Sequence, residues 1–365
     1  MGAPRVQQVV NNAAMSPAND SKTPSAVDGT LRKRVRVQMA DIARMAGVST
    51  ATVSRVMSGS DLVNEETRQR VMELAAKLNY RVDAAAARLR KGAVNTVGVV
   101  LLLDQGQAAT DPFMMNMVGH LADELGRREL DMLLARFDLG RREQLAEMVE
   151  TGRAAGVIVI GQSESHDYLN ELALRQFPKV VWGANLPDTR YTVVGTDNEL
   201  GGYLATQHLL QQGCRRIAFL GNEDHPEVAL RAKGYRRALR EYGLSPEPGL
   251  QLAVAFTASE NRPQMARWLP SAGPIDGAFA FSDVVAMGLV AVLEDAGLSV
   301  PKDVKVVGYD DVVAAEFVHP SISTVRQPLD MAARALVDSL LAAIQGQIQH
   351  SVVLPTTLVV RESSQ

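Results

Sequence analysis

The chain has 365 residues, of which 46% are hydrophobic, and its formal net charge is −3. A chain of this length is too long for one compact core, so we expect two or three domains. No apolar run approaches the roughly 18 residues of a membrane span, which excludes a membrane helix. Cys214 is the single cysteine, which excludes a disulfide framework and a cysteine zinc site and favours a reducing cytoplasm.

Residues 1–35 are predicted to form a disordered tail, because they are rich in Pro, Ser, Asn and Asp and contain no apolar region of a signal peptide. The charge that follows is uneven. Residues 31–92 contain 13 Lys and Arg against 6 Asp and Glu, whereas residues 93–365 contain 23 against 33. Net charges of +7 and −10 predict that only the basic head contacts a polyanion.

Residues 36–82 are predicted to form an all-α domain of three helices. The first, "MADIARMAG", ends at Gly47, which can adopt the left-handed conformation. Ser49 is placed as the N-cap of "TATVSRVM", and Asn64 as the N-cap of "NEETRQRVMELAAKLNY". A small residue at the helix crossing and a glycine in the turn are typical of a helix-turn-helix. The predicted core consists of Met39, Ile42, Ala43, Ala46, Val53, Val56, Val71, Leu74, Ala75 and Leu78.

The second helix has the composition of a helix that enters the major groove of DNA. Short hydroxyl and methyl side chains let its backbone approach bases and phosphates, and Arg55 is able to make two hydrogen bonds with a guanine edge. An ordinary surface helix with a solvated Arg55 is the alternative. The short residues are Ser49, Thr50, Ala51, Thr52 and Ser54.

From Thr96 onward, short apolar runs alternate with amphipathic helical patterns. Runs such as "TVGVVLLL", "GVIVIG" and "VKVVGYD" are hydrophobic at nearly every position, as strands covered on both faces are. The alternation predicts βαβ units, hence an α/β core of two doubly wound parallel-sheet lobes. A single barrel of eight βα units is the alternative. It would end in another helix, whereas this chain ends in the extended pattern "VVLPTTLVVRESS".

Polar and aromatic residues follow these runs, where the carboxyl ends of the strands are expected. Ligands of doubly wound folds bind at this edge. Carboxylates and a guanidinium that hold hydroxyl groups, with aromatic faces that stack on a pyranose ring, predict a sugar site. A helix cap is the alternative role for Asp111 and Asp283. The candidate residues are Asp111, Phe113, Trp182, Asn185, Arg231, Ser282, Asp283 and Asp310.

From about residue 37 to its C-terminus, the chain resembles the lactose-repressor/galactose-repressor (LacI/GalR) family of transcription regulators. The resemblance is carried by "MADIARMAGVSTATVSRVMSGSDLVNEETRQRVMELAAKLNYRVDAAAARLRKG" and continues through "VVGYDD", "STVRQP" and "LVVRES". It implies a homodimer whose heads read the two halves of a palindromic operator in double-stranded DNA. It also implies a two-lobed core like that of type I periplasmic sugar-binding proteins.

The same resemblance assigns roles in the head. Thr50, Ala51 and Arg55 match positions that read bases, and Tyr80 matches a tyrosine near the DNA backbone before the hinge. Positions that commonly hold phosphates are Ser49, Thr52, Ser54, Ser58, Asn64 and Thr67.

Residues 83–93 resemble the hinge helix of the family. Alanine favours a helix, but a segment of fewer than about 12 residues is marginal alone, so we expect it to fold only when two copies pair on DNA. Leu89 matches the leucine that wedges into the minor groove and kinks the central base step. Arg88 is expected to offset the acidic Asp83, which departs from the family pattern. A simple linker is the alternative.

Residues 94–365 resemble the effector-binding and dimerisation core of the family. The resemblance places lobe 1 at about 95–194 and 325–348, and lobe 2 at about 195–324 and 349–365. The positions that match effector contacts are Arg231, Phe256, Ser282, Asp283 and Asp310.

One departure from the family concerns the size of the pocket. Where the family often has Asp-Arg, this chain has Gly183 and Ala184. The loss of this bulky pair is expected to enlarge the pocket, so that Trp182 stacks on a second sugar ring.

No catalytic set, cofactor motif or metal site is found, because the six histidines lack ligand spacing and no Gly-rich phosphate loop is present. The sequence therefore predicts a non-enzymatic DNA-binding regulator of the cytoplasm and its nucleoid. We expect a repressor of carbohydrate-utilisation genes whose operator affinity is controlled by a glycoside or an oligosaccharide. The alternatives are a sugar-binding module without gene control, an α/β enzyme fused to a helix-turn-helix, and a regulator with a non-sugar effector such as a purine.

Overall fold

The computed structural model divides into two compact units, residues 1–84 and 85–365, which are described separately. Neither the predicted tail nor the predicted hinge helix is among the residues that the structure describes. The described residues are 39–57, 62–78, 94–103, 111–137, 142–162, 165–254 and 258–365.

The described residues of the first unit form three helices, α1 (Met39–Ala46), α2 (Thr50–Met57) and α3 (Glu65–Lys77), which confirms the predicted elements. Gly47 ends α1 with a φ of 67°, in the left-handed region that glycine adopts without strain. The predicted core is also confirmed, although Met39, Leu74 and Leu78 are only partly buried at its edge. Its buried members are Ile42, Ala43, Ala46, Val53, Val56, Val71 and Ala75.

Both predicted N-caps of this unit are present. Ser49 Oγ accepts a hydrogen bond of 3.1 Å from the Thr52 backbone N–H, and Asn64 Oδ1 accepts one of 2.9 Å from that of Thr67. Each cap satisfies one of the N–H groups that the first turn of a helix leaves free. The caps therefore fix where α2 and α3 begin.

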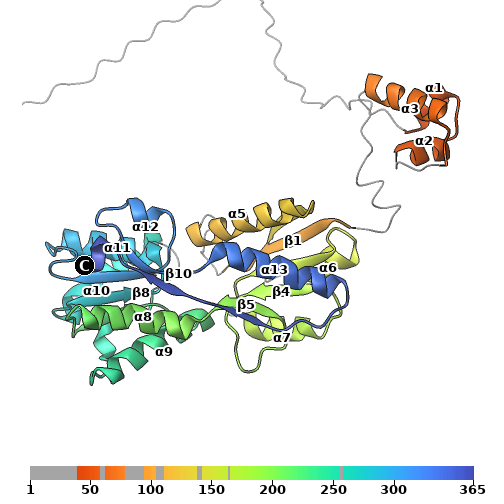
Figure 1. Ribbon diagram of the computed structural model, residues 1–365. Coiled ribbons are helices and arrows are strands. Elements are labelled where there is room, and N and C mark those ends of the chain that lie inside the picture. The colour runs from red at the N-terminus through yellow and green to blue at the C-terminus, as the bar shows by residue number, and fades with distance from the viewer. Residues whose placement is uncertain are drawn as a thin grey trace, which may run out of the picture. The chain divides into compact units, whose positions relative to one another are not determined.

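The first sheet of the core forms lobe 1 (Figure 1). Its strands are ordered β11-β5-β4-β3-β1-β2, and all neighbours are parallel. One face is covered by α5 and α13, and the other by α6 and α7. Its elements are β1 (Thr96–Leu101), α5 (Pro112–Arg127), β2 (Asp131–Arg136), α6 (Gln144–Glu150), β3 (Gly156–Ile160), α7 (His166–Ala173), β4 (Lys179–Trp182), β5 (Val193–Thr196), α13 (Leu329–Ile344) and β11 (Val352–Leu354).

The second sheet forms lobe 2, in the order β12-β10-β9-β8-β6-β7. β6 and β8 are buried at every position, which requires helices on both faces. Its elements are α8 (Asn198–Gln211), β6 (Ile217–Leu220), α9 (Pro226–Glu241), the 3-10 turn η2 (Pro248–Leu250), β7 (Gln251–Leu252), α10 (Ala258–Ala272), β8 (Gly277–Ala280), α11 (Asp283–Asp295), β9 (Lys305–Asp310), α12 (Ala314–Phe317), β10 (Ser323–Arg326), β12 (Thr357–Val359) and the 3-10 turn η3 (Glu362–Ser364).

The chain crosses between the lobes three times, after β5, after β10 and after β11. The prediction that residues 349–365 all belong to lobe 2 is wrong, because β11 pairs in parallel with β5 in the sheet of lobe 1. Lobe 1 resumes after Arg326, where β10 ends in the other sheet, which is close to the predicted bound at about residue 325. An extended pattern carries no signal of which sheet its strand joins.

The last strand departs from the predicted parallel order, because β12 is antiparallel to β10. The strands of each lobe run toward the other lobe, and the chain passes from β11 to β12 without a helix in between. β12 therefore begins next to lobe 1 and runs away from it, in the direction opposite to β10. Two open sheets exclude the alternative of one barrel. In the described part of the chain, no helix is long and apolar enough to cross a membrane.

Candidate functional site

Helix α2 exposes the residues that are predicted to read bases. Thr50, Ala51 and Arg55 are exposed, whereas Val53 and Val56 are buried in the core of the head. Residues 51 and 55 are four positions apart and so lie on one face of the helix. This outer face combines short side chains with a long cation, which suits an approach to base edges.

The predicted phosphate contacts surround the N-termini of α2 and α3. Ser49 and Asn64 are exposed N-caps, while Thr52, Ser54 and Thr67 are half-buried. Free N–H groups and the helix dipole favour an anion at such N-termini. Ser58, Tyr80, Arg88 and Leu89 lie outside the described residues, as does Phe256 of the predicted effector site.

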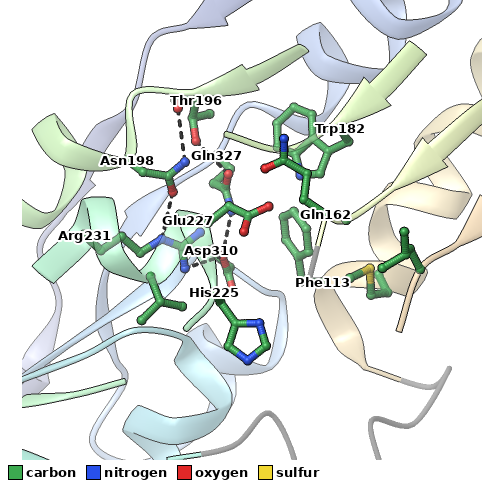
Figure 2. Close-up of a pocket in the computed structure, with 15 residues that line it drawn as sticks. Phe113, Gln162, Trp182, Thr196, Asn198, His225, Glu227, Arg231, Asp310 and Gln327 are labelled. Carbon is green, nitrogen blue, oxygen red and sulfur yellow. Dashed lines mark hydrogen bonds and ion pairs between the residues drawn. The ribbon is translucent and has the colours of Figure 1, made fainter. Parts of the chain in front are cut away.

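A pocket lies between the two lobes, at the carboxyl ends of strands from both sheets (Figure 2). Its empty volume is about 640 Å³, solvent at the mouth included. Four of the predicted effector residues line it: Phe113, Trp182, Arg231 and Asp310. The other lining residues are Leu102, Met114, Gly161, Gln162, Gly183, Thr196, Asn198, His225, Glu227, Val228 and Gln327.

Arg231 reaches the pocket from α9 and is 6% exposed. Its Nε donates to Asn198 Oδ1 over 2.8 Å and its Nη1 to the Phe281 carbonyl over 2.6 Å, while the guanidinium stacks 3.6 Å from the Tyr309 ring centroid. These contacts fix the direction of the guanidinium.

The position of Arg231 depends on a close crossing of α8 and α9. A Cβ at Gly202 would lie 2.0 Å from the Arg231 carbonyl oxygen, and a Cβ at Gly234 would lie 2.0 Å from that of Glu199. Only glycine fits at these two points, because real Cβ contacts are never so short. The crossing brings Asn198, at the start of α8, next to Arg231.

Asp310 ends β9 and faces Arg231, whose Nη1 lies 3.9 Å from its Oδ1. Gln327 Nε2 donates to the same Oδ1 over 2.7 Å, and Thr196 Oγ1 donates to Gln327 Oε1 over 2.8 Å. Burial and, to a smaller extent, the nearby Asp111 carboxylate raise the pKa of Asp310 to about 7, although the charge of Arg231 and the hydrogen bond from Gln327 lower it. This carboxylate therefore exchanges its proton near neutral pH.

Phe113 and Trp182 form the apolar wall of the pocket on lobe 1, with ring centroids 6.3 Å apart. Gln162 holds the chain beside them, because its Nε2 donates to the Ala184 carbonyl and its Oε1 accepts from the Ala184 N–H, each over 2.8 Å. A Cβ at Gly183 would lie 2.5 Å from Gln162 Cδ. The expected enlargement at Gly183 is therefore wrong at this point, because Gln162 fills the space.

Asp111, Asn185, Ser282 and Asp283 do not line the pocket. Asp111 caps α5, with Oδ1 3.1 Å from the Met114 N–H, and Ser282 caps α11. Asp283 is fully buried and accepts a hydrogen bond of 2.9 Å from the Val312 N–H, so it holds the loop after β9. Asn185 is exposed. The cap alternative for Asp111 is confirmed.

Several polar lining residues are absent from the sequence prediction. Gln162 directly follows the run "GVIVIG", so the rule that finds Asp310 also finds it. Thr196 ends β5 and Asn198 follows it, and the two valines of this strand before Gly195 are too short an apolar run to predict a strand. Gln327 lies in "STVRQP" at the end of β10, where a crossover is not visible in the sequence.

Comparisons with known proteins agree with this architecture. The family model of bacterial regulatory proteins of the lacI family matches residues 38–83, and that of the periplasmic binding protein-like domain matches residues 206–364. The HTH-type transcriptional regulator CelR of Thermobifida fusca is 32% identical over 339 residues, which cover 91% of this chain and 100% of CelR. The chain belongs to the LacI family. It is a transcriptional regulator, which confirms the resemblance and excludes a sugar-binding module without gene control.

Two solved structures place this LacI-family regulator among its relatives. A transcriptional regulator CelR–cellobiose complex is 30% identical, has a TM-score of 0.66, and covers 90% of this chain and 100% of its own. A lac repressor dimer bound to operator and the anti-inducer ONPF is 24% identical, has a TM-score of 0.80, and covers 90% of this chain and 99% of its own. The second likeness is one of fold, and it confirms the predicted head and two-lobed α/β core.

Proposed function

We propose that this LacI-family regulator binds a palindromic operator as a homodimer and that a glycoside or an oligosaccharide in the pocket between the lobes controls its operator affinity. Its role is to repress carbohydrate-utilisation genes in the cytoplasm, on the nucleoid, and it catalyses no reaction. The proposed DNA-binding region is residues 36–82, followed by the hinge at 83–93. The core from residue 94 onward senses the effector and dimerises.

The observation that carries the effector proposal is the pairing of two opposite walls in one pocket. Arg231, Asp310 and Asn198 supply hydrogen-bonding groups on lobe 2, and Phe113 and Trp182 supply aromatic faces on lobe 1. A saccharide has hydroxyl groups around its rim and apolar C–H faces, so it matches both walls at once. The CelR–cellobiose complex supports a disaccharide as the first candidate.

The proposed dimer joins two cores through the face of α12. Phe317 is 79% exposed and Val313, four residues earlier, is 64% exposed. Large apolar side chains this exposed and this close together are typical of an interaction surface. A second copy of the chain is the occupant that a symmetric operator requires, because each half-site takes one head.

The test combines DNA and effector binding on the full-length protein. Operator half-sites are selected from randomised duplexes, and binding is followed by fluorescence anisotropy with and without cellobiose, glucose, ribose or hypoxanthine. We expect a symmetric preferred site, affinity that falls steeply with salt, and a change of operator affinity with cellobiose. Arg231→Met should abolish the response to the sugar and leave operator binding intact.

The matched control is Arg267→Met, an exposed arginine on α10, which should keep the wild-type response. In the head, Arg55→Ala should relax base preference by about 1–3 kcal/mol at one position of each half-site. A response to hypoxanthine alone would assign a purine effector instead. A monomer without preference for any symmetric duplex would contradict the proposal as a whole.

A further inference from the structure

Helices that begin at the edge of the pocket carry acidic residues at their N-termini. In doubly wound folds such N-termini meet at the ligand edge and often bind phosphate through their free N–H groups. Here Asp111 and Asp197 are the N-caps of α5 and α8, and Glu227 and Asp283 lie in the first turns of α9 and α11. At each of α5 and α8, one of these N–H groups already donates to a carboxylate, that of Met114 to Asp111 Oδ1 and that of Leu200 to Asp197 Oδ1.

The guanidinium of Arg231 in the pocket already has partners within the chain. Among the described lining residues, Arg231 is the single Lys or Arg, and it faces Asp310 and donates to Asn198 and to the Phe281 carbonyl. The neighbouring stretches of sequence that the structure does not describe, 104–110, 163–164 and 255–257, contain no Lys or Arg. An anionic ligand would therefore find no second Lys or Arg among the described lining residues.

Glu227 adds a carboxylate to the pocket itself. Figure 2 shows it between Arg231 and Gln162, and it lines the cavity. The Glu227 carboxylate also acts on lobe 1. It raises the pKa of Tyr191, and among the causes that raise this pKa only burial is larger. Glu227 lies in the first turn of α9, next to Pro226 at the helix start.

We propose that the pocket admits uncharged saccharides and rejects sugar phosphates and sugar acids, and that Glu227 determines this selectivity. The inference rests on the proposed sugar function. A phosphate group carries a charge of about −1.5 to −2 near pH 7. In the pocket it would lose its hydration and face Glu227 and Asp310, with a single guanidinium that is already engaged. A hydroxyl group at the same place donates to these carboxylates.

Isothermal titration calorimetry at pH 8 tests the inference with matched pairs of probes: cellobiose and cellobiose 6-phosphate, glucose and glucose 6-phosphate, ribose and ribose 5-phosphate. In each pair that binds, we expect the neutral sugar to bind at least 30-fold more tightly than its phosphate. Glu227→Gln should reduce this ratio about tenfold, because it removes the charge at nearly constant volume. Glu294→Gln, the same change at an exposed position at the end of α11, should leave the ratio unchanged.

The outcomes separate this inference from the function on which it rests. A phosphorylated sugar that binds as tightly as its neutral partner overturns the selectivity and leaves the sugar function intact. If the Glu227→Gln variant is folded by circular dichroism and keeps the wild-type ratio of neutral-sugar affinity to sugar-phosphate affinity, the role of Glu227 is overturned. If no probe of any pair binds, the sugar function and the selectivity are both overturned.

Discussion

Asp310 is a polar residue at the end of a strand, and Arg231 is a cation inside a helix. Each is identifiable in the sequence. Their environment is not, since it comes from residues far along the chain. Gln327 bonds the carboxylate of Asp310, and Asn198 fixes the guanidinium of Arg231. Both side chains are more than nine-tenths buried. At this scale, tertiary neighbours determine whether a recognisable residue is ionised and where it points.

Effector binding should depend on pH through the ionisation of Asp310. Its pKa of about 7 means that the carboxylate ionises between about pH 6 and 8. An ionised carboxylate is the stronger acceptor for sugar hydroxyls. Cellobiose affinity should therefore rise about tenfold from pH 6 to pH 8 and then level off. Asp310→Asn should bind more weakly and lose this dependence, as measured by calorimetry. An identical pH profile in the variant would contradict the assignment.

The same shift has a consequence for folding. The native pKa of Asp310 lies above the roughly 3.9 of an unfolded aspartate, so the folded protein holds this proton longer. Between about pH 4 and pH 7 the free energy of unfolding should therefore fall as the pH rises, by the contribution of this group.

At the scale of elements, the three crossovers are connected to one another and to the pocket. Thr196, at the end of β5, donates to Gln327, directly after β10, which in turn donates to Asp310. Thr356, between β11 and β12, donates to the Arg326 carbonyl over 3.0 Å. A ligand that contacts Asp310 therefore acts on the same network that joins the segments between the lobes. This network is a route by which an effector biases the arrangement of the lobes.

Thr196→Val tests this route, because it removes the hydroxyl donor at nearly constant volume. Since Thr196 bonds to Gln327 and not to Arg231 or Asp310, we expect cellobiose affinity to change less than about fivefold. Cellobiose should still change the operator affinity of the variant, but the logarithm of that change should be half the wild-type value or less. The coupling between the two sites is a free energy separate from the affinity for cellobiose, so the variant can lose one and keep the other. Anisotropy titrations of the operator with and without cellobiose measure this coupling.

Thr206→Val is the control for that experiment. Thr206 is a buried threonine of lobe 2 whose hydroxyl donates within α8, to the Gly202 carbonyl, away from the crossovers. It should retain the wild-type coupling even if it loses some stability. Equal coupling in both variants would show that the crossover network does not transmit the effector signal.

At the scale of the whole molecule, regulation requires that two heads be held at a defined separation, which a single chain does not provide. The heads are proposed to read half-sites, and the cores are proposed to pair through Val313, which precedes α12, and Phe317, which ends it. Binding at two linked sites increases operator affinity by effective concentration. Loss of the pairing should therefore weaken operator binding without changing the effector pocket.

Phe317→Asp is expected to dissociate the dimer at micromolar concentration, because it places a charge in the apolar contact. Sedimentation velocity should show a monomer, and operator affinity should fall at least tenfold while cellobiose binding is retained. Leu174→Asp, at a similarly exposed leucine after α7, should remain dimeric. A dimeric Phe317→Asp variant with unchanged operator affinity would place the interface elsewhere.

The local signals of this chain predict most of its elements. Gly47, the Ser49 and Asn64 caps and the apolar periodicity of 39–80 predict the head, because each acts within one or two turns of helix. Uninterrupted apolar runs predict buried parallel strands for the same reason. The two-residue strand β7 and the strand β5, whose sequence is VVGT, give no such signal, because each contains at most two consecutive apolar residues.

Only the tertiary structure decided which elements share a sheet and which residues share the pocket. β11 and β12 have similar extended sequences, yet one joins lobe 1 and the other lobe 2, because sheet partners are chosen by long-range pairing. Thr196 and Gln327, at two of the crossovers, meet Gln162, which follows β3, in one pocket. Local composition encodes the propensity and burial of each segment, whereas the convergence of distant side chains depends on how the packed layers meet.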